Sequence, residues 1–428
     1  MAGPSEVLNR QTQASHTFRA FQNGSFRRLW PANLLSYTAR WMQMTMISLL
    51  VLRLTDSPWM VALVGFFGMA PLLALALVGG LLADRFDKQR LYAITQTANL
   101  VVAAGMAVAL MLDWVHVWHA YLTVLLMGTA WALDFPARRS LIHDLLGRDG
   151  VTNGIALDSV AMHGSRMLGP ALAGGLMTWV DASGGYVVVS AFYVVAAILL
   201  WSLGAPPGRV RQGQLSNPLR NLLEGLRYVR SNQVILATIS ITVLMNFLFF
   251  SYQQMVPVIA KDTLRVGEGL TGVLMAAEGM GALLGAFAIA SFARLRHHGH
   301  LYTFGSLLAL ALLLFFSFSR WYSLSFSLLL LMGLGISGFS TMQSTIVVLV
   351  AKDEMRGRAL GVISLGIGAG PLGTLMVGAV ADRFSPGFAI GVDACIGLVL
   401  VLMVWLLMPA LRRPLVPDEA RRPATLGR

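Results

Sequence analysis

The chain has 428 residues, of which 56% are hydrophobic and only 12% are charged. A soluble domain carries about 25% charged residues, so this composition excludes a soluble globular fold and indicates an integral membrane protein. The net charge of +12 does not by itself indicate nucleic-acid binding, because the basic residues must first be placed relative to the membrane segments. A single cysteine, Cys395, excludes an intramolecular disulfide and a cysteine-built metal site.

Twelve segments are expected to cross the membrane, since a bilayer core about 30 Å thick needs roughly 20 apolar residues per helix. The polar stretch 1–28 comes first and is not expected to contain a cleaved signal. Apolar runs then occupy 57–83, 91–112, 114–133, 182–208, 231–260, 321–351 and 359–381, with further segments at 155–180 and 301–319. The other three runs each contain one charge near their middle or outer part, namely Arg40, Glu278 and Asp393.

We therefore predict an all-α membrane protein of two six-helix bundles, at 29–204 and 233–411. A cytoplasmic segment at 1–28, a cytoplasmic linker at 205–232 and a cytoplasmic tail at 412–428 complete the chain. In the linker, four leucines recur at helical spacing opposite charged positions: Leu219, Leu222, Leu223 and Leu226. That pattern is typical of a helix lying on the membrane surface.

The distribution of Lys and Arg over alternate connections orients the protein. Most of the 32 basic residues fall on the side of the N-terminus, so the positive-inside rule places both termini in the cytoplasm. The residues expected on the opposite side are Arg53, Lys261, Arg265, Arg320 and Arg383. We expect a multi-pass protein of the cell inner membrane, and no nucleic-acid partner, because the positive charge is a topology signal.

Two Gly-Pro pairs indicate an internal repeat. Gly169 and Pro170 in the fifth segment match Gly370 and Pro371 in the eleventh, and both pairs follow a short basic cytoplasmic loop. A weak internal repeat is typical of secondary transporters whose halves rock about a central site near the bilayer midplane. A Gly-Pro pair removes a helix hydrogen bond and a side chain, so we expect each pair to let its helix bend and pack closely.

The loop between the second and third segments reads GGLLADRFDKQR and resembles the cytoplasmic signature of the major facilitator superfamily, although Asp87 stands where that pattern prefers glycine. The stretch DFPARRS, from Asp134, and the stretch GSRMLGPALAGG, from Gly164, are similar to a bacterial branch of this superfamily that contains the enterobactin exporter and drug and macrolide efflux proteins. This resemblance implies alternating access, with a cytoplasmic gate formed by Gly80, Asp84, Arg85, Asp134 and Arg138.

Charges within the membrane segments point to a transport cavity. A charge near the bilayer centre costs at least ~2.5 kcal/mol, so such side chains face a cavity or a partner. The candidates are Arg40, Asp158, His163, Arg166 and Glu278, with Asp158 and His163 on the same broad arc of the fifth helix as Arg166. His163 is either a proton carrier or a hydrogen-bonded packing residue. We assign Asp393 mainly to local packing.

Two interpretations of Glu278 stay open. Among apolar neighbours it would load and release a proton and so couple transport to the proton gradient. Beside Arg40 or Arg166 it would instead form an ion pair, either structural or a lock that exists in one state. Arginines in the cavity also suggest an anionic substrate, since guanidinium groups bind carboxylate and phenolate oxygens. The HHGH stretch at 297–300 is explained by topology rather than by a metal.

No phosphate loop, metal-protease histidine pair or nucleophile elbow is present, so we expect neither an enzyme nor a cofactor. The prediction is a secondary transporter that exports a small amphipathic or anionic compound, a siderophore or a drug, in exchange for protons. The alternatives are a transporter of iron, another metal-related solute or a lysophospholipid, and a non-transporting membrane scaffold. The expected partners are the substrate, protons and membrane lipid, and we expect a monomer.

Overall fold

The computed structural model describes residues 19–85, 87–203, 218–291 and 297–414. Every regular element in these ranges is helical, as the sequence predicts. The element order is η1 (Arg19–Gln22), α2 (Gly24–Thr55), α3 (Pro58–Arg85), α4 (Lys88–Met111), α5 (Val117–Trp201), α6 (Pro218–Ser231), α7 (Gln233–Leu244), η2 (Met245–Phe249), η3 (Phe250–Gln254), α8 (Val256–Asp262), α9 (Glu268–Ser291), α10 (His298–Phe318), α11 (Tyr322–Val350), α12 (Asp353–Ile367), α13 (Gly370–Arg383), α14 (Pro386–Leu407) and η4 (Pro409–Arg412).

Among the described residues, ten helical segments are long and apolar enough to cross a membrane. One of them, Gly150–Trp201, has 52 residues and would be about 78 Å long as a single helix, more than twice the thickness of a bilayer core. Helix α5, which contains it, leaves helical geometry at Gly147, with φ 65°, and at Asp181, with φ 57°. The multi-pass character is confirmed, whereas the count of twelve crossings stays a prediction.

Helix α2 is not one of these ten segments because its inner face is polar. Asn23 caps its start by accepting hydrogen bonds from the backbone of Ser25 and Phe26, so the helix begins several residues before the predicted bundle boundary at 29. Six small or amide side chains along it are buried: Asn33, Ser36, Thr38, Gln43, Thr45 and Ser48. A helix with such a face belongs in the interior of the protein rather than against lipid.

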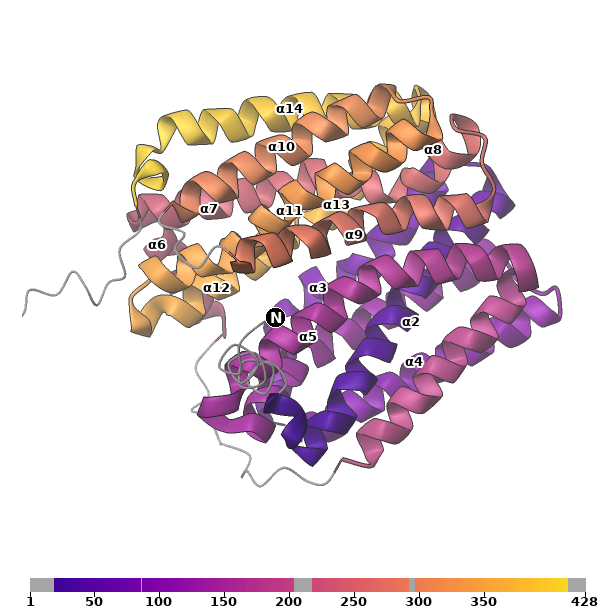
Figure 1. The fold of residues 1–428 in the computed structure, drawn as a ribbon, viewed down its shortest axis with the longest axis horizontal. Coiled ribbons are helices and arrows are strands. Elements are labelled where there is room, and N and C mark those ends of the chain that lie inside the picture. Colours follow the sequence, from indigo (N-terminus) through magenta and orange to yellow (C-terminus); the bar gives the residue numbers. More distant parts are fainter. Residues whose placement is uncertain (1–18, 86, 204–217, 292–296, 415–428) are drawn as a thin grey trace, which may run out of the picture.

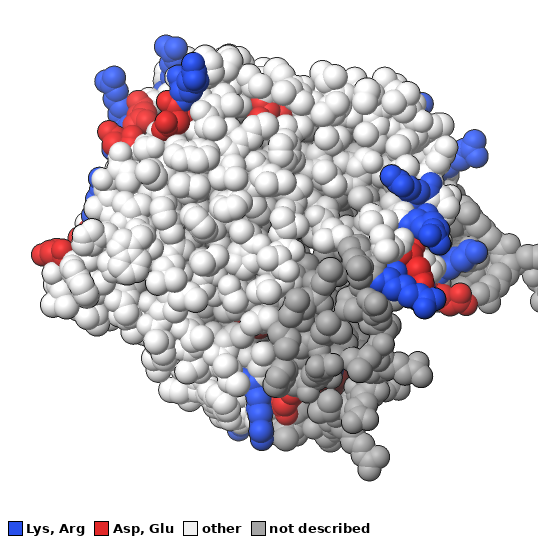
Figure 2. Space-filling model, turned by 180° about the vertical axis from the view of Figure 1, so that it is seen from behind, with Lys and Arg blue, Asp and Glu red and all other residues white. Residues whose placement is uncertain are grey.

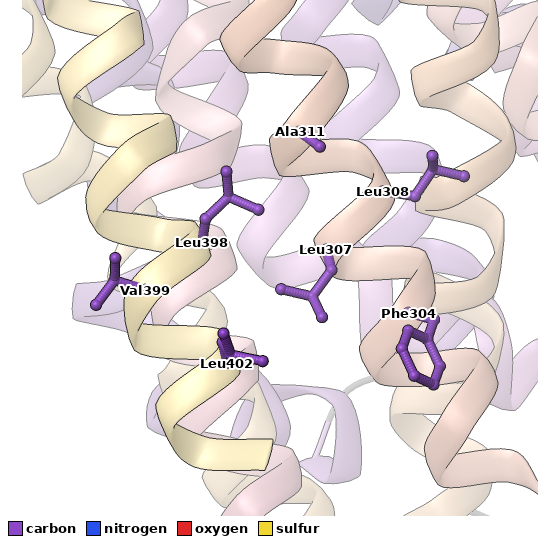
Figure 3. A pocket seen from close by; sticks show the side chains of 7 residues that line it. All are labelled: Phe304, Leu307, Leu308, Ala311, Leu398, Val399 and Leu402. Carbon is purple, nitrogen blue, oxygen red and sulfur yellow. The ribbon is translucent and has the colours of Figure 1, made fainter. Parts of the chain in front are cut away.

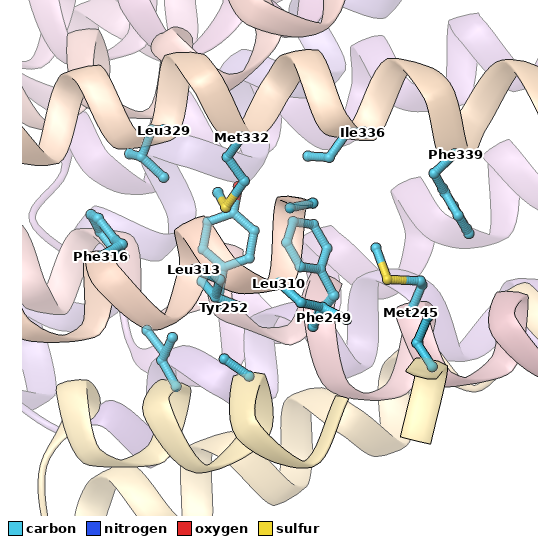
Figure 4. Close-up of a cluster of buried hydrophobic side chains, with 14 of the residues drawn as sticks. Met245, Phe249, Tyr252, Leu310, Leu313, Phe316, Leu329, Met332, Ile336 and Phe339 are labelled. Carbon is cyan, nitrogen blue, oxygen red and sulfur yellow. The ribbon is translucent and has the colours of Figure 1, made fainter. Parts of the chain in front are cut away.

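The helices form two groups that lie side by side (Figure 1). We call α2–α5 the first half and α6–η4 the second half. Each half has its own apolar cores, and the largest, in the second half, packs α10 and α11 against η2 and η3 (Figure 4). Charged side chains gather at the ends of the helices, and the face between them is mostly uncharged (Figure 2). Large apolar side chains are exposed outside the cores, such as Trp179 at 85% and Phe318 at 76%, as expected for contact with lipid.

The helices run between two ends of the molecule. The start of α2, the α3–α4 turn and α6 lie at one end, which we call the terminal end. The turns α2–α3, α8–α9 and α13–α14 lie at the other, which we call the distal end. The part of the linker at 205–217 lies outside the described residues, but α6 confirms the helix predicted in it. On α6, Glu224 binds Arg220 at 2.8 Å and Arg358 of α12 at 3.0 Å.

The two Gly-Pro pairs differ in what they do. Gly370 and Pro371 begin α13 after the break that follows α12, so this pair accompanies an interrupted helix. Gly169 and Pro170 lie in a stretch of α5 with helical dihedral angles, so the expected equivalence of the two pairs is not seen in the backbone. Gly169 does permit close packing, since a Cβ atom there would lie 2.4 Å from Cβ of Trp41.

Candidate functional site

A buried ion pair joins the two halves. Nη2 of Arg166, on α5, lies 2.5 Å from Oε1 of Glu278, on α9. Glu278 is 5% exposed, so its carboxylate is removed from solvent and depends on this partner. Of the two arginines considered as partners for Glu278, the structure therefore selects Arg166. Arg40 does not reach the pair.

Two residues of η3 complete the shell around Glu278. The hydroxyl of Tyr252 and Nε2 of Gln253, 3.0 Å away, both donate to Oε2 of Glu278. The guanidinium carbon of Arg166 lies 5.3 Å from the ring centroid of Trp41 and 5.9 Å from that of Phe250. The carboxylate thus accepts on both oxygens, and the cation rests against aromatic faces from both halves.

The ion pair lies near mid-depth of the membrane region. Glu268 begins α9 at the distal end, and Glu278 follows ten residues later, which corresponds to about 15 Å along a helix. That distance is about half of a bilayer core roughly 30 Å thick. The position agrees with the midplane site expected of a two-bundle transporter.

Glycines allow α5 and α9 to approach closely beside the pair. A Cβ atom at Gly272 would lie 2.3 Å from the carbonyl oxygen of Pro170, and one at Gly279 would lie 2.7 Å from the backbone nitrogen of Met167. Backbone therefore meets backbone between the halves, as at interfaces of small residues in membrane proteins. The Gly-Pro pair of the first half lies at this contact rather than at a helix break.

A second set of polar contacts joins the halves at the distal end. Arg53 of α2 places Nε 2.8 Å and Nη2 2.6 Å from the two carboxylate oxygens of Glu268, and it also binds Asp181 at 2.7 Å. Nζ of Lys261 lies 2.6 Å from Asp56. We call Arg53, Glu268, Lys261 and Asp56 the distal lock. The sequence analysis named Arg53 and Lys261 only as two of the few basic residues on the side opposite the termini. Their unusual position was the signal that could have identified them as partners of acidic residues.

Asp134 and Arg138 lie inside the first half. Nη2 of Arg138 is 3.2 Å from Oδ1 of Asp134, which also receives a hydrogen bond of 2.6 Å from Gln96 on its other oxygen. The guanidinium lies over two tyrosine rings, 4.3 Å and 4.4 Å from the centroids of Tyr37 and Tyr92. Both charged side chains are almost completely buried. Their contact does not bridge the halves, so their part in a gate stays a prediction.

Arg40 occupies a separate position in the first half. Its guanidinium lies 4.4 Å from the ring centroid of Trp131 and donates to the carbonyl of Met127 at 3.3 Å. Together with Arg138 and Tyr193 it lines a cavity of about 10 Å³, about the space of one water molecule. Its charge is thus held by a ring face and a carbonyl rather than by Glu278.

The remaining candidates have mostly local partners. Asp158 accepts hydrogen bonds from Asn33 at 2.7 Å and Tyr37 at 3.1 Å, so it is paired with α2 rather than with Arg166. His163 is half-buried on α5, three residues before Arg166. Asp393 is buried and accepts from Ser251 at 3.3 Å, as its assignment to packing predicts.

Part of the predicted cytoplasmic gate lies outside the described side chains, namely Gly80, Asp84 and Arg85. The backbone places them in the last turns of α3, at the terminal end. Nearby, Lys88 at the start of α4 binds Asp144 at 2.6 Å, and both belong to the first half. The pair of Lys88 with Asp144 and the pairs of Glu224 with Arg220 and Arg358 each join partners within one half, in contrast to the distal lock.

Known proteins resemble the chain over nearly its whole length. The family described as transmembrane secretion effector matches residues 15–420. The staphyloferrin A transporter of Staphylococcus aureus is 22% identical over 355 residues, covering 82% of this chain and 88% of that protein. The enterobactin exporter EntS of Citrobacter koseri is 25% identical over 425 residues, covering 96% of this chain and all of that protein.

Solved structures share the fold. The nucleoside transporter NupG superposes with a TM-score of 0.69 at 14% identity, over 89% of this chain and 98% of that chain. A bacterial homolog of the human lysosomal transporter Spinster superposes with a TM-score of 0.66 at 15% identity, over 91% and 95% of the two chains. The helical halves, the membrane segments and the match over 15–420 agree: this chain belongs to the transmembrane secretion effector family of major facilitator transporters and is not an enzyme.

Proposed function

We propose that this protein exports a small anionic or amphipathic compound, with a siderophore as the leading substrate, by alternating access in exchange for protons. The observation that carries the proposal is the Arg166–Glu278 pair, a buried cation and anion that join the halves near mid-depth. The relatives named for staphyloferrin A and enterobactin support a siderophore, and the arginine supports an anion.

Twelve crossings with both termini in the cytoplasm complete the proposal. The geometry breaks at Gly147 and Asp181 divide α5 into three stretches, and α2 adds a span that the ten apolar segments do not include. The terminal end, where the basic side predicted from sequence lies, is then cytoplasmic. The distal lock closes the outer side, so this conformation corresponds to the state that receives substrate from the cytoplasm.

The exchange follows from competition for one guanidinium. An anionic substrate that enters from the terminal end binds Arg166 through its oxygens and displaces the carboxylate of Glu278. In this proposal the carboxylate of Glu278, parted from its cation, carries a proton while the halves are open outward, because an unpaired charge inside the membrane is costly. When Arg166 and Glu278 pair again, that proton is released to the cytoplasm. Each cycle thus moves one anion out and one proton in.

Arg40 supplies further positive charge to the first half in this proposal. It lies on α2, as does Trp41, whose ring contacts Arg166. Asp158 and His163 lie on the same helix as Arg166, α5, and help to position it. In the state that opens at the distal end, Asp84 and Arg85 hold the terminal end closed. Under the same scheme a drug is the second substrate class, since aromatic rings line the pair and would accept an amphipathic molecule.

The test uses purified full-length protein in lipid vesicles with an imposed pH gradient and a labelled catecholate or carboxylate siderophore. We expect Arg166→Gln to weaken substrate binding by about 10- to 100-fold, because a hydrogen bond to a charged group contributes about 1.5–3 kcal/mol. Glu278→Gln removes the competing carboxylate, so binding tightens while flux loses its dependence on the pH gradient. The two substitutions should therefore change the substrate affinity in opposite directions.

Asp393→Asn provides the matched control, since it neutralises a buried carboxyl whose partner is Ser251 rather than an arginine. Flux of the wild type that is unaffected by collapsing the pH gradient would exclude proton exchange. Flux of an iron complex or a lysophospholipid, with none of free siderophore, would favour the alternative cargo. No flux for any of these compounds in vesicles that hold folded protein would favour the scaffold.

A further inference from the structure

An apolar groove opens between α10 and α14 on the outer face of the second half (Figure 3). It has a volume of about 620 Å³, within the 300–1,000 Å³ range of ligand sites in proteins. Seven apolar side chains line it: Phe304, Leu307, Leu308, Ala311, Leu398, Val399 and Leu402. The groove lies away from the Arg166–Glu278 pair, so the transport cycle does not account for it.

The groove runs from the leaflet on the terminal side to just past the middle of the membrane. Helix α10 begins at His298, so Phe304 lies about 9 Å and Ala311 about 20 Å along the helix from the terminal end. A bilayer leaflet contributes about 15 Å of hydrocarbon. Most of the groove therefore faces the acyl chains of the leaflet on the terminal side, and its end at Ala311 lies just past the midplane.

An aromatic and basic cluster stands where the groove meets the terminal end. Phe304, which lines the groove, lies 6.0 Å from the ring of His300 and 5.4 Å from that of Trp405. The guanidinium of Arg412 lies 5.4 Å from the Trp405 ring and donates to the carbonyl of Trp405 at 2.7 Å. Gly299 ties the two segments together, since a Cβ atom there would lie 2.0 Å from the carbonyl oxygen of Leu411.

Within the part of the chain that the structure describes, no carboxylate balances the charge of this cluster. The sequence from 297 to 300 and from 408 to 413 contains no Asp or Glu. Arg413 is exposed, and no ion pair is seen for it or for Arg412 among the described residues. The buried Nδ1 atoms of His298 and His300 also have no hydrogen-bond partner. Cations elsewhere at the terminal end, such as Lys88 and Arg358, bind carboxylates.

We propose that this groove is a binding site for an anionic phospholipid of the terminal-side leaflet. One acyl chain fills the groove between α10 and α14. The phosphate group lies over the basic cluster, where Arg412 and Arg413 supply positive charge and the His300 ring supplies a hydrogen-bond donor. Basic pockets between membrane helices are suited to acidic headgroups, and Trp405 has the amphipathic ring that membrane interfaces favour.

The experiment measures lipid retained by the purified full-length protein with native mass spectrometry, after exchange into dioleoylphosphatidylglycerol or dioleoylphosphatidylcholine. We expect the wild type to retain at least fivefold more phosphatidylglycerol than phosphatidylcholine. Arg413→Gln should reduce this preference at least threefold. Ala311→Trp fills the groove and should reduce retention of both lipids.

Two control variants make the same types of substitution at positions away from the groove. Arg320→Gln removes an exposed arginine at the distal end of α10, and Ala288→Trp adds an indole at an exposed position of α9. Neither should change lipid retention. Phosphatidylglycerol with brominated acyl chains should quench more of the tryptophan fluorescence in the wild type than in Trp405→Phe. Equal retention of the two lipids by the wild type would overturn the proposal, as would an unchanged preference in Arg413→Gln together with unchanged retention in Ala311→Trp.

Discussion

Breaking the distal lock at Arg53 should open the distal end by a predictable amount. Arg53 binds both carboxylate oxygens of Glu268 across the halves, whereas its other partner, Asp181, belongs to the same half. Exposed ion pairs contribute about 0.2–1 kcal/mol, and a two-point arginine contact lies at the upper end of this range. Arg53→Gln should therefore cost the closed state about 1 kcal/mol, a factor of about 5 in the conformational equilibrium.

Spin labels at the distal ends of the two halves provide the assay. Trp114 and Trp321 are exposed in distal turns of the first and second half, at 66% and 75%. Both are changed to cysteine for labelling, and Cys395, which is exposed, is changed to serine. Pulsed electron-spin measurements in lipid nanodiscs then give the fractions with short and long distances. In Arg53→Gln the ratio of long to short should rise about fivefold over the parent.

Asp181→Asn is the control for this prediction. It breaks an ion pair of the same arginine but leaves the contact with Glu268, and asparagine has the shape of the aspartate that already adopts φ 57° at this position. The distance distribution of Asp181→Asn should match the parent. High salt should reproduce part of the Arg53→Gln effect, because exposed charges are screened. The reasoning is refuted if both variants shift the distribution equally, or if neither does.

Three further changes test other parts of the structure. Asp134→Ala leaves Arg138 buried without its carboxylate and should destabilise the folded protein by about 3–5 kcal/mol, measured by thermal unfolding in detergent; a loss below 1 kcal/mol would contradict the buried pairing. Gly272→Val should lower the closed distal fraction in the spin-label assay, while Gly361→Val, with free space around it, should not. Arg220 lowers the pKa of Glu224, so the ion pairs of Glu224 hold above its ordinary pKa and are lost only as the pH falls through the lowered value. The hydrogen-exchange protection factors of α6 should therefore be equal at pH 7 and 5, and lower in Glu224→Gln.

The sequence sufficed for the features that depend on length and composition. The apolar runs predicted membrane helices, and the spacing of Leu223 and Leu226 predicted the surface helix α6. Arg166 and Glu278 were identifiable because a charge in a long apolar run is costly unless it is paired. Whether Glu278 pairs with an arginine, and with which one, stayed open. Helical periodicity predicts which face of its own helix a residue occupies, but it does not predict which helix packs against that face.

Other features depend on contacts between distant segments. Gln253 is an ordinary amide in an apolar run, and only the packing of η3 against α9 brings it to Glu278. Asp134 and Arg138 were assigned to the gate by the resemblance to the family, and only the structure shows that α5 continues as a helix through both and buries them. The sequence did separate two spans at Asp181, which lies between the runs 155–180 and 182–208, and the structure has a positive φ there.

The uneven winding of the span that contains η2 and η3 has a mechanical consequence. This span, Gln233–Asp262, is α-helical at both ends but passes through five π-helical residues, Met245–Phe249, and five 3-10 residues, Phe250–Gln254. A 3-10 residue rises about 2.0 Å instead of 1.5 Å, so five such residues are about 2.5 Å longer than the same stretch of α-helix. Rewinding these five residues as α-helix would shorten the span by about 2.5 Å, which would shift Tyr252 and Gln253 relative to Glu278 and draw α7 and α8 closer along the axis.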